Sequence, residues 1–416
     1  MNLSILGRIA VWGILLLTLV LSPALGSASS VLALLLGLTL VPVAWRDGAV
    51  AEIRRAPAQV IFIGVVLVLT LLYAITARQP TDVLFFANFL AMPLSALVYV
   101  IALRRRGEAI MVLLVRLCAL GALAALAFAL FDIYGRGLDR AQGLIGNPNL
   151  MPRLALPLGF AAMAGFFVDT GRRRWLYLLG PLAAIIVTVL TESRGAALAV
   201  PAMAAIAAIF LWRDKQGRWL VIVGGSLGAV ALAAGLAIMG DDLLGRFGSI
   251  AETIGNVLQT GQANGDGSTA DRLRMYEAGI EAIRLSPWIG WGWANLGHAA
   301  AEMRPEHFAN EAGTMFMFHN DAINFAVAGG VVGVACLAAL LVAPIVGALA
   351  SPRDRYFAVR LYCCLILSVG YAIFGLTDST LGYDAPTTLY AFLTAMVLGA
   401  FREPVTPSDG DRAARP

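Results

Sequence analysis

The stretch AVAGGVVGVACLAALLVAPIVGALA, residues 326–350, contains no charged side chain and decides the class of fold. A helix needs about 20 consecutive apolar residues to cross about 30 Å of hydrocarbon, and this run is longer than that. Over the 416 residues of the chain, 59% of side chains are hydrophobic and 13% are charged, with a mean hydropathy of +0.80. So much apolar surface cannot be enclosed in one soluble core, and we predict an all-α polytopic integral membrane protein.

Similar apolar runs recur along the whole chain, which predicts about 12 transmembrane helices. We place them at residues 6–25, 30–45, 58–76, 83–103, 110–131, 152–168, 175–190, 195–212, 219–239, 319–349, 357–377 and 385–401. The run 319–349 is long for one crossing, so we expect it to be tilted or to extend past the membrane. The first run resembles a signal peptide, but a second follows at once, so we expect an uncleaved helical hairpin. The four cysteines lie within apolar runs and are expected to be buried thiols.

The distribution of basic residues predicts how the chain is oriented. One set of alternate loops carries 19 Lys and Arg residues, and the other set, although longer, carries 10. By the positive-inside rule the first set is cytoplasmic, with both termini. Arg116 lies inside a span, where we expect it to snorkel to the cytoplasmic surface. Because the basic residues form short clusters between apolar runs rather than one charged face, we expect no nucleic-acid partner.

This topology places the long loops on the outer face and divides the chain into four parts. They are transmembrane helices 1–9 over residues 1–239, a large periplasmic loop over 240–318, transmembrane helices 10–12 over 319–401, and a disordered cytoplasmic tail over 402–416.

The large loop has recognisable local signals. A helix is expected to begin at Ser268 or Thr269 and to end before Pro287, with Arg272 and Tyr276 on one face. The three Trp of WIGWGWANLG, residues 288–297, favour the membrane interface.

Several polar side chains gather on the predicted outer face. Arg194, in TESRGA, lies in a very short turn between two spans, where an unpaired charge is costly. It marks either a functional site, a salt bridge to Glu192 or a lipid-phosphate contact. The loop GRGLDRAQGLIGNPNLMPRLALP, residues 135–157, adds further candidates, which alone would be ordinary turn chemistry. They are Arg136, Arg140, Asn147, Asn149 and Arg153.

Together with Arg272 of the large loop, these arginines would present several guanidinium forks, which suit phosphate oxygens. No Gly-rich nucleotide loop and no acidic metal cage occurs in the sequence. The set therefore fits a phosphate-bearing lipid neutralised by arginine rather than by Mg²⁺.

The stretch MFHNDAINF, residues 317–325, places His319 at the start of the long apolar run. A histidine there can be a helix cap or an interface residue. It can also act as a base, because an imidazole exchanges a proton near neutral pH and a neighbouring carboxylate can fix its tautomer. Asp378, in GLTDSTLGYDAP, opens another loop on the same predicted face.

These motifs, taken in order, resemble the bacterial O-antigen ligase (lipopolysaccharide ligase) family of the O-antigen ligase/polymerase superfamily. The matching stretches are RAQGLIGNPN, TESRGA, DRLRMYEAGIEAIRLSPWIGWGWANLG and HNDAINFAVAGGVVG. The resemblance implies a GT-C-like glycosyltransferase in the bacterial inner membrane. It would move O-antigen from undecaprenyl pyrophosphate to a terminal sugar of lipid A-core at the periplasmic face, with inversion, without a metal and without a cofactor.

The resemblance also implies roles for individual residues. His319 would be the general base, and Arg194 and Arg272 would hold the pyrophosphate and stabilise the leaving group. The expected substrate-binding residues are Arg136, Arg140, Asn147, Asn149, Tyr276, Asn320 and Asp378, of which Asp378 would orient His319.

Two alternatives remain open. An O-antigen polymerase or a protein O-oligosaccharyltransferase of the same superfamily would share the donor and differ in the acceptor. A transporter for an anionic lipid or solute would belong to another class, but it should show inverted repeats and polar groups at the bilayer midplane. Here the polar residues gather at one face, apart from Arg116.

Overall fold

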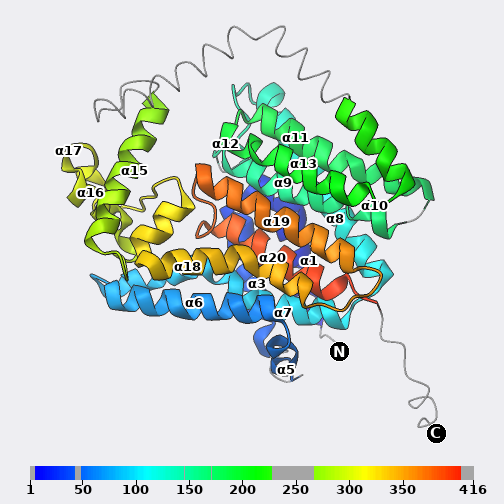
Figure 1. Ribbon diagram of the computed structural model, residues 1–416, viewed down its shortest axis with the longest axis horizontal. Coiled ribbons are helices and arrows are strands. Elements are labelled where there is room, and N and C mark those ends of the chain that lie inside the picture. Colours follow the sequence, from blue (N-terminus) through cyan, green and yellow to red (C-terminus); the bar gives the residue numbers. More distant parts are fainter. Residues whose placement is uncertain (1–4, 43–47, 145, 170, 227–266, 404–416) are drawn as a thin grey trace.

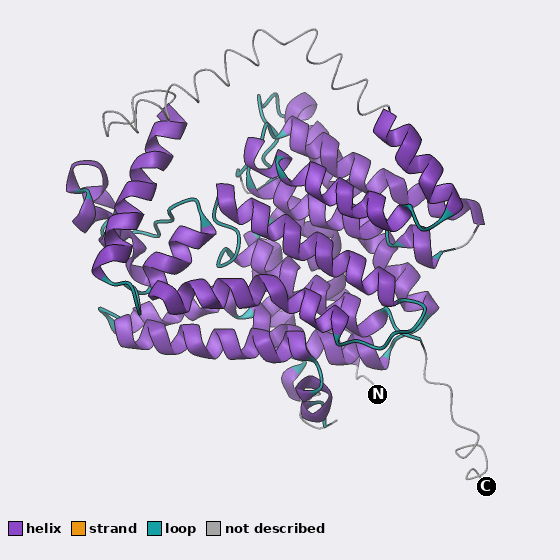
Figure 2. Cartoon of the chain, in the orientation of Figure 1, coloured by secondary structure: helices purple, strands orange, loops and turns teal. Residues whose placement is uncertain are grey.

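The computed structural model describes residues 5–42, 48–144, 146–169, 171–226 and 267–403, and all regular structure within them is helical (Figures 1 and 2). The elements are α1 (Ile5–Leu16), η1 (Leu17–Leu21), α2 (Ser22–Leu25), α3 (Ser27–Leu38), α5 (Val50–Arg54), α6 (Pro57–Thr76), η2 (Pro80–Phe89), α7 (Ala91–Arg104), α8 (Glu108–Leu130), η3 (Phe131–Gly135), α9 (Leu150–Ala162), α10 (Gly165–Val168), η4 (Gly171–Leu178), α11 (Leu179–Leu190), α12 (Arg194–Ala197), α13 (Ala199–Leu211), α15 (Gly267–Leu285), η5 (Trp293–Asn295), α16 (Leu296–Met303), α17 (Pro305–Phe308), η6 (Ala309–Glu311), α18 (Asp321–Leu349), α19 (Phe357–Thr377) and α20 (Asp384–Ala400).

Nine helical segments of the described ranges are long and apolar enough to cross a membrane, and each coincides with a predicted span. They are Gly7–Leu25, Pro57–Thr76, Pro80–Arg104, Glu108–Gly135, Leu150–Val168, Gly171–Leu190, Arg194–Leu211, Asp321–Leu349 and Phe357–Thr377. The chain is therefore an all-α polytopic membrane protein, as predicted.

The other three predicted spans have a different outcome. The run 30–45 corresponds to α3, which has 12 residues, and the run 385–401 corresponds to α20, which has 17. Most of the run 219–239 lies outside the described residues. Every residue of α20 from Ala385 to Ala400 is buried, because α3, α7, α9 and α19 pack around it. A helix enclosed by protein does not have to match the full thickness of the hydrocarbon.

The long run that begins at Asp321 is broken rather than simply tilted. Gly330 has φ +58°, which interrupts α18 and turns the chain sharply. A Cβ atom at Gly330 would lie 2.4 Å from the backbone carbon of Trp288, so only glycine fits this crossing. Three backbone hydrogen bonds join residues 287–292 to α18 at this crossing. The N–H groups of Trp291, Gly292 and Val331 donate to the carbonyls of Val327, Ala328 and Pro287 over 2.8–2.9 Å.

At one end of the bundle, α15, α16 and α17 form a helical cap (Figure 1). The observed bounds of α15 agree with the predicted helix to within two residues. The face of α15 that carries Arg272 and Tyr276 also carries Gly279, and it packs on the start of α18. A Cβ atom at Gly279 would lie 2.5 Å from Ile323. Trp288 is exposed, but Trp293 is 2% exposed and packs edge-on against Phe89 and Phe325. The expectation that all three Trp lie at the membrane surface was therefore wrong for Trp293, which fills the junction between cap and bundle.

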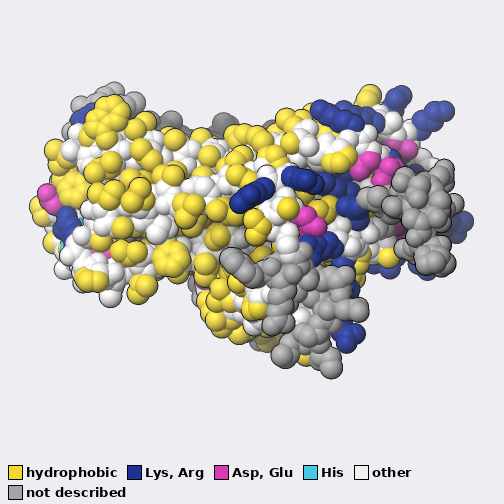
Figure 3. Space-filling view, turned by 90° about the horizontal axis from the view of Figure 1, so that it is seen from below, with side chains coloured by type: hydrophobic (Ala, Val, Ile, Leu, Met, Phe, Trp, Pro, Cys, Tyr) yellow, Lys and Arg dark blue, Asp and Glu magenta, His cyan; other side chains and the backbone are white. Residues whose placement is uncertain are grey.

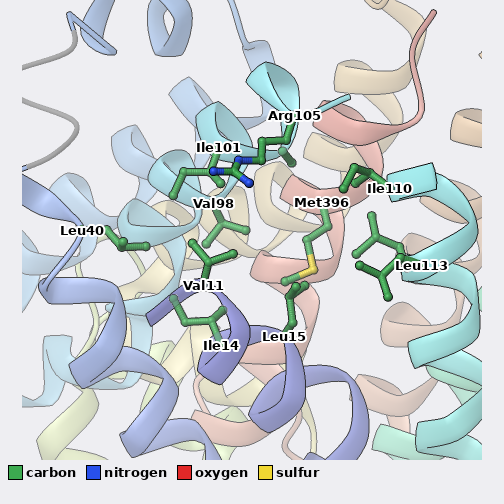
Figure 4. A pocket seen from close by; sticks show the side chains of 12 residues that line it. Val11, Ile14, Leu15, Leu40, Val98, Ile101, Arg105, Ile110, Leu113 and Met396 are labelled. Atoms are coloured by element: carbon green, nitrogen blue, oxygen red, sulfur yellow. The ribbon is translucent and has the colours of Figure 1, made fainter. Parts of the chain in front are cut away.

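The surface of the bundle is polarised along its long axis. Figure 3 shows hydrophobic side chains over much of the visible face, with Lys and Arg gathered toward the end away from α15–α17. The four cysteines are free thiols buried in the bundle, as predicted. An apolar gap of about 70 Å³ lies between α1, α7, α8 and α20, with Arg105 across it (Figure 4). It is much smaller than the several hundred Å³ of a usual ligand site.

Candidate active site

His319 is held in position by the residues on both sides of it. Phe318 is fully buried and its N–H donates to Oδ1 of Asn324 at 2.8 Å. Asn320 caps α18, with its Oδ1 accepting from the N–H of Ile323 at 3.2 Å. Between these anchors His319 adopts φ +51°, a left-handed conformation that a residue with a side chain rarely holds without support. The Asn cap and the buried Phe supply that support.

Asp378 fixes the orientation of the His319 ring. It follows the last residue of α19, and its Oδ1 lies 2.6 Å from Nδ1 of His319. Its other oxygen, Oδ2, pairs with Nη2 of Arg153, whose side chain is almost wholly buried. Arg153 also donates from Nη1 to the carbonyl of Ser379 at 2.9 Å. One carboxylate is thus shared between an imidazole and a buried guanidinium.

The charge state of Asp378 determines which ring nitrogen of His319 is free. Burial alone would raise the pKa of Asp378, but the hydrogen bond with His319 and the charge of Arg153 outweigh it and hold that pKa well below its ordinary value. An ionised carboxylate only accepts hydrogen bonds, so Nδ1 of His319 must carry the proton. The neutral ring therefore keeps an unprotonated Nε2, which is the arrangement of a general base.

The site opens into a cavity of about 390 Å³, and the side chain of His319 is 42% exposed. The walls come from four parts of the chain that are distant in sequence, residues 147–153, 275, 311–319 and 378–383. The lining residues are Asn147, Asn149, Leu150, Arg153, Met275, Glu311, Met315, Phe316, Met317, His319, Asp378, Ser379 and Tyr383.

The loop before α9 brings Asn147 and Asn149 to this cavity. Oδ1 of Asn147 accepts from the N–H groups of Asn149 and Leu150 at 3.0 and 3.3 Å, which forms a turn just before α9. Oδ1 of Asn149 accepts from the hydroxyl of Ser193 at 3.2 Å. Arg140 donates from Nε and Nη2 to the carbonyl of Thr191 at 3.0 and 2.8 Å. The loop and the Arg194 turn are thereby held together.

Arg136 is placed differently. Its Nη1 pairs with the buried Asp132 at 2.8 Å and donates to the carbonyl of Gly143 at 3.2 Å. The N–H groups of Gln142 and Gly143 also bind Asp132. Arg136 therefore closes its own loop and does not line the cavity.

Tyr276 approaches His319 from α15, and Arg272 lies one turn earlier on the same helix. The hydroxyl of Tyr276 donates to the His319 carbonyl at 3.2 Å. Burial raises the pKa of Tyr276, and the positive charge of Arg272, one turn earlier, opposes that increase. The amide of Asn320 donates to the carbonyl of Leu376 at 3.0 Å, which joins the start of α18 to the end of α19.

Arg194 begins α12 and is exposed. The next residue, Gly195, abuts Thr377, since a Cβ there would lie 2.5 Å from Oγ1 of Thr377. Arg194 thus lies beside the end of α19 that carries Asp378. The alternative ion pair between Arg194 and Glu192 is not present among the described residues. Arg194 and Arg272 are not cavity-lining residues in this structure, although both lie on elements that contact the site.

Sequence reasoning named Arg153 among the polar candidates but gave it no role in the site, and it did not name Tyr383 or Glu311. Arg153 had a usable signal, an arginine three residues inside an otherwise apolar helix. Tyr383 reaches the cavity from the turn before α20 and Glu311 from the end of η6, and only the assembled fold brings them there.

Comparison with known proteins gives two matches. Residues 179–338 match the sequence profile of the family described as O-antigen ligase. Over these residues the chain is similar to the O-antigen ligase superfamily. It is also 28% identical over 200 residues to the exopolysaccharide production protein ExoQ of Rhizobium meliloti (strain 1021), an alignment that covers 46% of this chain. The chain spans 42% of the length of that relative.

The part that matches the O-antigen ligase family contains Arg194, Arg272 and His319. Arg153 and Asp378 lie outside it, one before and one after. Members of this superfamily are glycosyltransferase-like enzymes that use lipid-linked polysaccharides. The ring orientation described above therefore depends on residues from both flanks of the matched part.

Proposed function

We propose that this chain is a GT-C-like, lipid-linked-glycan-dependent glycosyltransferase of the O-antigen ligase superfamily. It transfers O-antigen from undecaprenyl pyrophosphate to a terminal sugar of lipid A-core. The observation that carries the proposal is the His319–Asp378–Arg153 chain at the wall of a cavity large enough for sugar units. A buried, ionised carboxylate behind an exposed imidazole is what activation of a hydroxyl nucleophile requires.

In the proposed reaction, Nε2 of His319 removes the proton from the acceptor hydroxyl. The oxygen attacks the anomeric carbon of the donor as the bond from that carbon to the pyrophosphate oxygen breaks, with inversion. The electron pair leaves with the lipid pyrophosphate. Arg194 and Arg272 are proposed to bind its oxygens and stabilise the charge, because guanidinium forks pair with phosphate bidentately. Asn147, Asn149 and Tyr383 are positioned to hydrogen-bond sugar hydroxyls in the cavity.

An adjoining apolar groove supports a lipid donor. This groove, of about 400 Å³, shares Met315 and Tyr383 with the polar cavity. Val31, Leu34, Leu35 and Leu38 form one stripe along α3 and line it. A donor with its pyrophosphate at the polar cavity would lay its lipid chain along this stripe beyond the first two isoprene units.

The orientation proposed for the chain places both termini in the cytoplasm and the cavity at the periplasmic face of the inner membrane. The basic end of the bundle in Figure 3 supports it.

A second candidate is a polymerase, in which the acceptor is another lipid-linked glycan. The similarity to a protein named for exopolysaccharide production favours considering it. The donor site and the base would be unchanged.

The test uses the purified full chain with a lipid-linked glycan, in parallel with lipid A-core and without it. The ligase predicts glycan on lipid A-core only, whereas glycan lengthening without lipid A-core would favour the polymerase. His319→Ala should still bind the donor but form no product, and the exposed His307→Ala serves as a matched control. Full transfer by His319→Ala would exclude the base assignment.

A further inference from the structure

A second cluster of charged side chains lies at the opposite end of the bundle from His319. Arg116 on α8, Asp169 after α10 and Tyr177 on η4 meet there. The hydroxyl of Tyr177 donates to Oδ2 of Asp169 at 2.8 Å, and Arg116 approaches both, with Nη2 at 3.5 Å from Oδ2 of Asp169 and Nε at 3.4 Å from the hydroxyl. These long contacts leave the Arg116 side chain 53% exposed.

Arg116 and Arg173 line one groove of about 450 Å³ between α8 and the η4–α11 segment. Arg116 is the ninth residue of α8 and lies inside a membrane-spanning helix, about 12 Å along the axis from its first residue. Arg173 belongs to the basic turn at the start of η4 and is exposed. Two guanidinium groups therefore border an open groove at the edge of the hydrocarbon.

The groove changes from charged to apolar along the helix axis. Leu120 and Leu123 follow Arg116 on the same face of α8, about 6 and 10 Å deeper. Leu176 and Leu179 form the opposite wall, and all four leucines are exposed. This order, cations first and then hydrocarbon, matches the order of headgroup and acyl chain in a phospholipid.

We propose that this groove binds one anionic glycerophospholipid of the adjacent leaflet. Arg116 and Arg173 contact the headgroup phosphate, and the four leucines contact an acyl chain. The carboxylate of Asp169 lies behind Arg116 and directs its guanidinium, whereas the net positive charge of the groove selects against zwitterionic lipids. This site is independent of the proposed transfer reaction, because no residue of it contacts the His319 cavity.

The experiment measures lipid binding to the purified full chain by native mass spectrometry. Phosphatidylglycerol and phosphatidylcholine with identical acyl chains are the two probes. The chain should retain phosphatidylglycerol preferentially. Loss of one arginine should weaken that binding about fivefold, and the double variant Arg116→Gln, Arg173→Gln about twentyfold, with phosphatidylcholine unchanged.

The matched control is Arg213→Gln with Arg353→Gln, which removes the same charge at arginines that stack on Phe210 and Phe357 outside the groove. An unchanged lipid preference in the Arg116, Arg173 double variant would overturn the proposal, and so would an equal loss in the control. Should the double variant fail to fold, Arg173→Gln and the groove-filling Leu120→Trp test the same claim separately. Displacement of the lipid by millimolar inorganic phosphate alone would also overturn it.

Discussion

The carboxylate of Asp378 joins His319 to Arg153, with Nδ1 of His319 at 2.6 Å from one oxygen and the buried guanidinium on the other. We therefore expect Asp378→Asn to lower kcat for glycan transfer by about 10²–10⁴-fold, because an amide no longer enforces the tautomer that leaves Nε2 free. Measuring kcat for glycan transfer with a lipid-linked donor tests this prediction. Asp271→Asn, an exposed carboxylate on α15 paired with Arg274, is the control. Activity within twofold of the unchanged chain would contradict the assignment.

The same substitution should reduce stability in a pH-dependent manner. The pKa of Asp378 is lower in the folded chain than its ordinary value near about 4. Its stabilising contribution is therefore complete above about pH 4 and is lost as the pH falls below that value toward the folded pKa. At neutral pH we expect Asp378→Asn to cost about 3 kcal/mol, since Arg153 loses its partner. Unfolding in detergent at pH 7 and pH 3 should show the difference shrinking, and a difference that grows toward pH 3 would refute this.

Arg194 and Arg272 are predicted to act as forks rather than as point charges. Arg194→Lys and Arg272→Lys should each lower kcat/KM by about 10–100-fold, because lysine keeps the charge but not bidentate pairing. The exposed Arg284→Lys on α15 is the control. Wild-type kinetics in both variants would mean that the pyrophosphate lies elsewhere.

The α3 groove predicts a dependence on the length of the donor lipid. Leu35→Trp should raise KM for an undecaprenyl-linked donor by about tenfold and leave a donor with two isoprene units unaffected, since a short chain does not reach the stripe. Leu71→Trp, an exposed leucine on α6, adds the same bulk away from the groove. Equal effects on both donors would remove the groove from the binding path.

Gly330 should be the least replaceable glycine of α18. Gly330→Ala is expected to cost about 2 kcal/mol, because a left-handed conformation is unfavourable for alanine by about 1–2 kcal/mol and the new Cβ would meet the Trp288 backbone. Thermal unfolding in detergent measures it. Gly64→Ala on α6, with open space around it, should be neutral, and equal stability of the two variants would disprove the tight crossing.

Hydropathy predicted most of the fold because the membrane imposes length and apolarity on each crossing. It did not distinguish α20, which protein surrounds, from the helices that face lipid, and it could not foresee that Gly330 breaks α18, because a glycine in an apolar run is compatible with a straight helix. The break in α18 depends on hydrogen bonds to residues 287–292. These residues are distant in sequence, and only folding brings them next to Gly330.

The site was partly predictable for a similar reason. His319, Asp378, Asn147 and Asn149 are polar residues at the predicted ends of spans, and the structure brings them to one cavity. Arg136 differs because its nearest carboxylate, Asp132, is one helical turn away and buried. Partner choice of this kind depends on loop geometry that hydropathy does not encode.

The left-handed backbone of His319 has one further consequence. A residue outside the common regions of φ and ψ has few neighbouring backbone conformations, and Asp378 holds the ring, so the imidazole points in a direction that is set when the chain folds and not when substrate arrives. Such a base is preorganised. A change of sugar acceptor during evolution would then require changes in the loops that shape the cavity. The orientation of the His319 imidazole would stay constant.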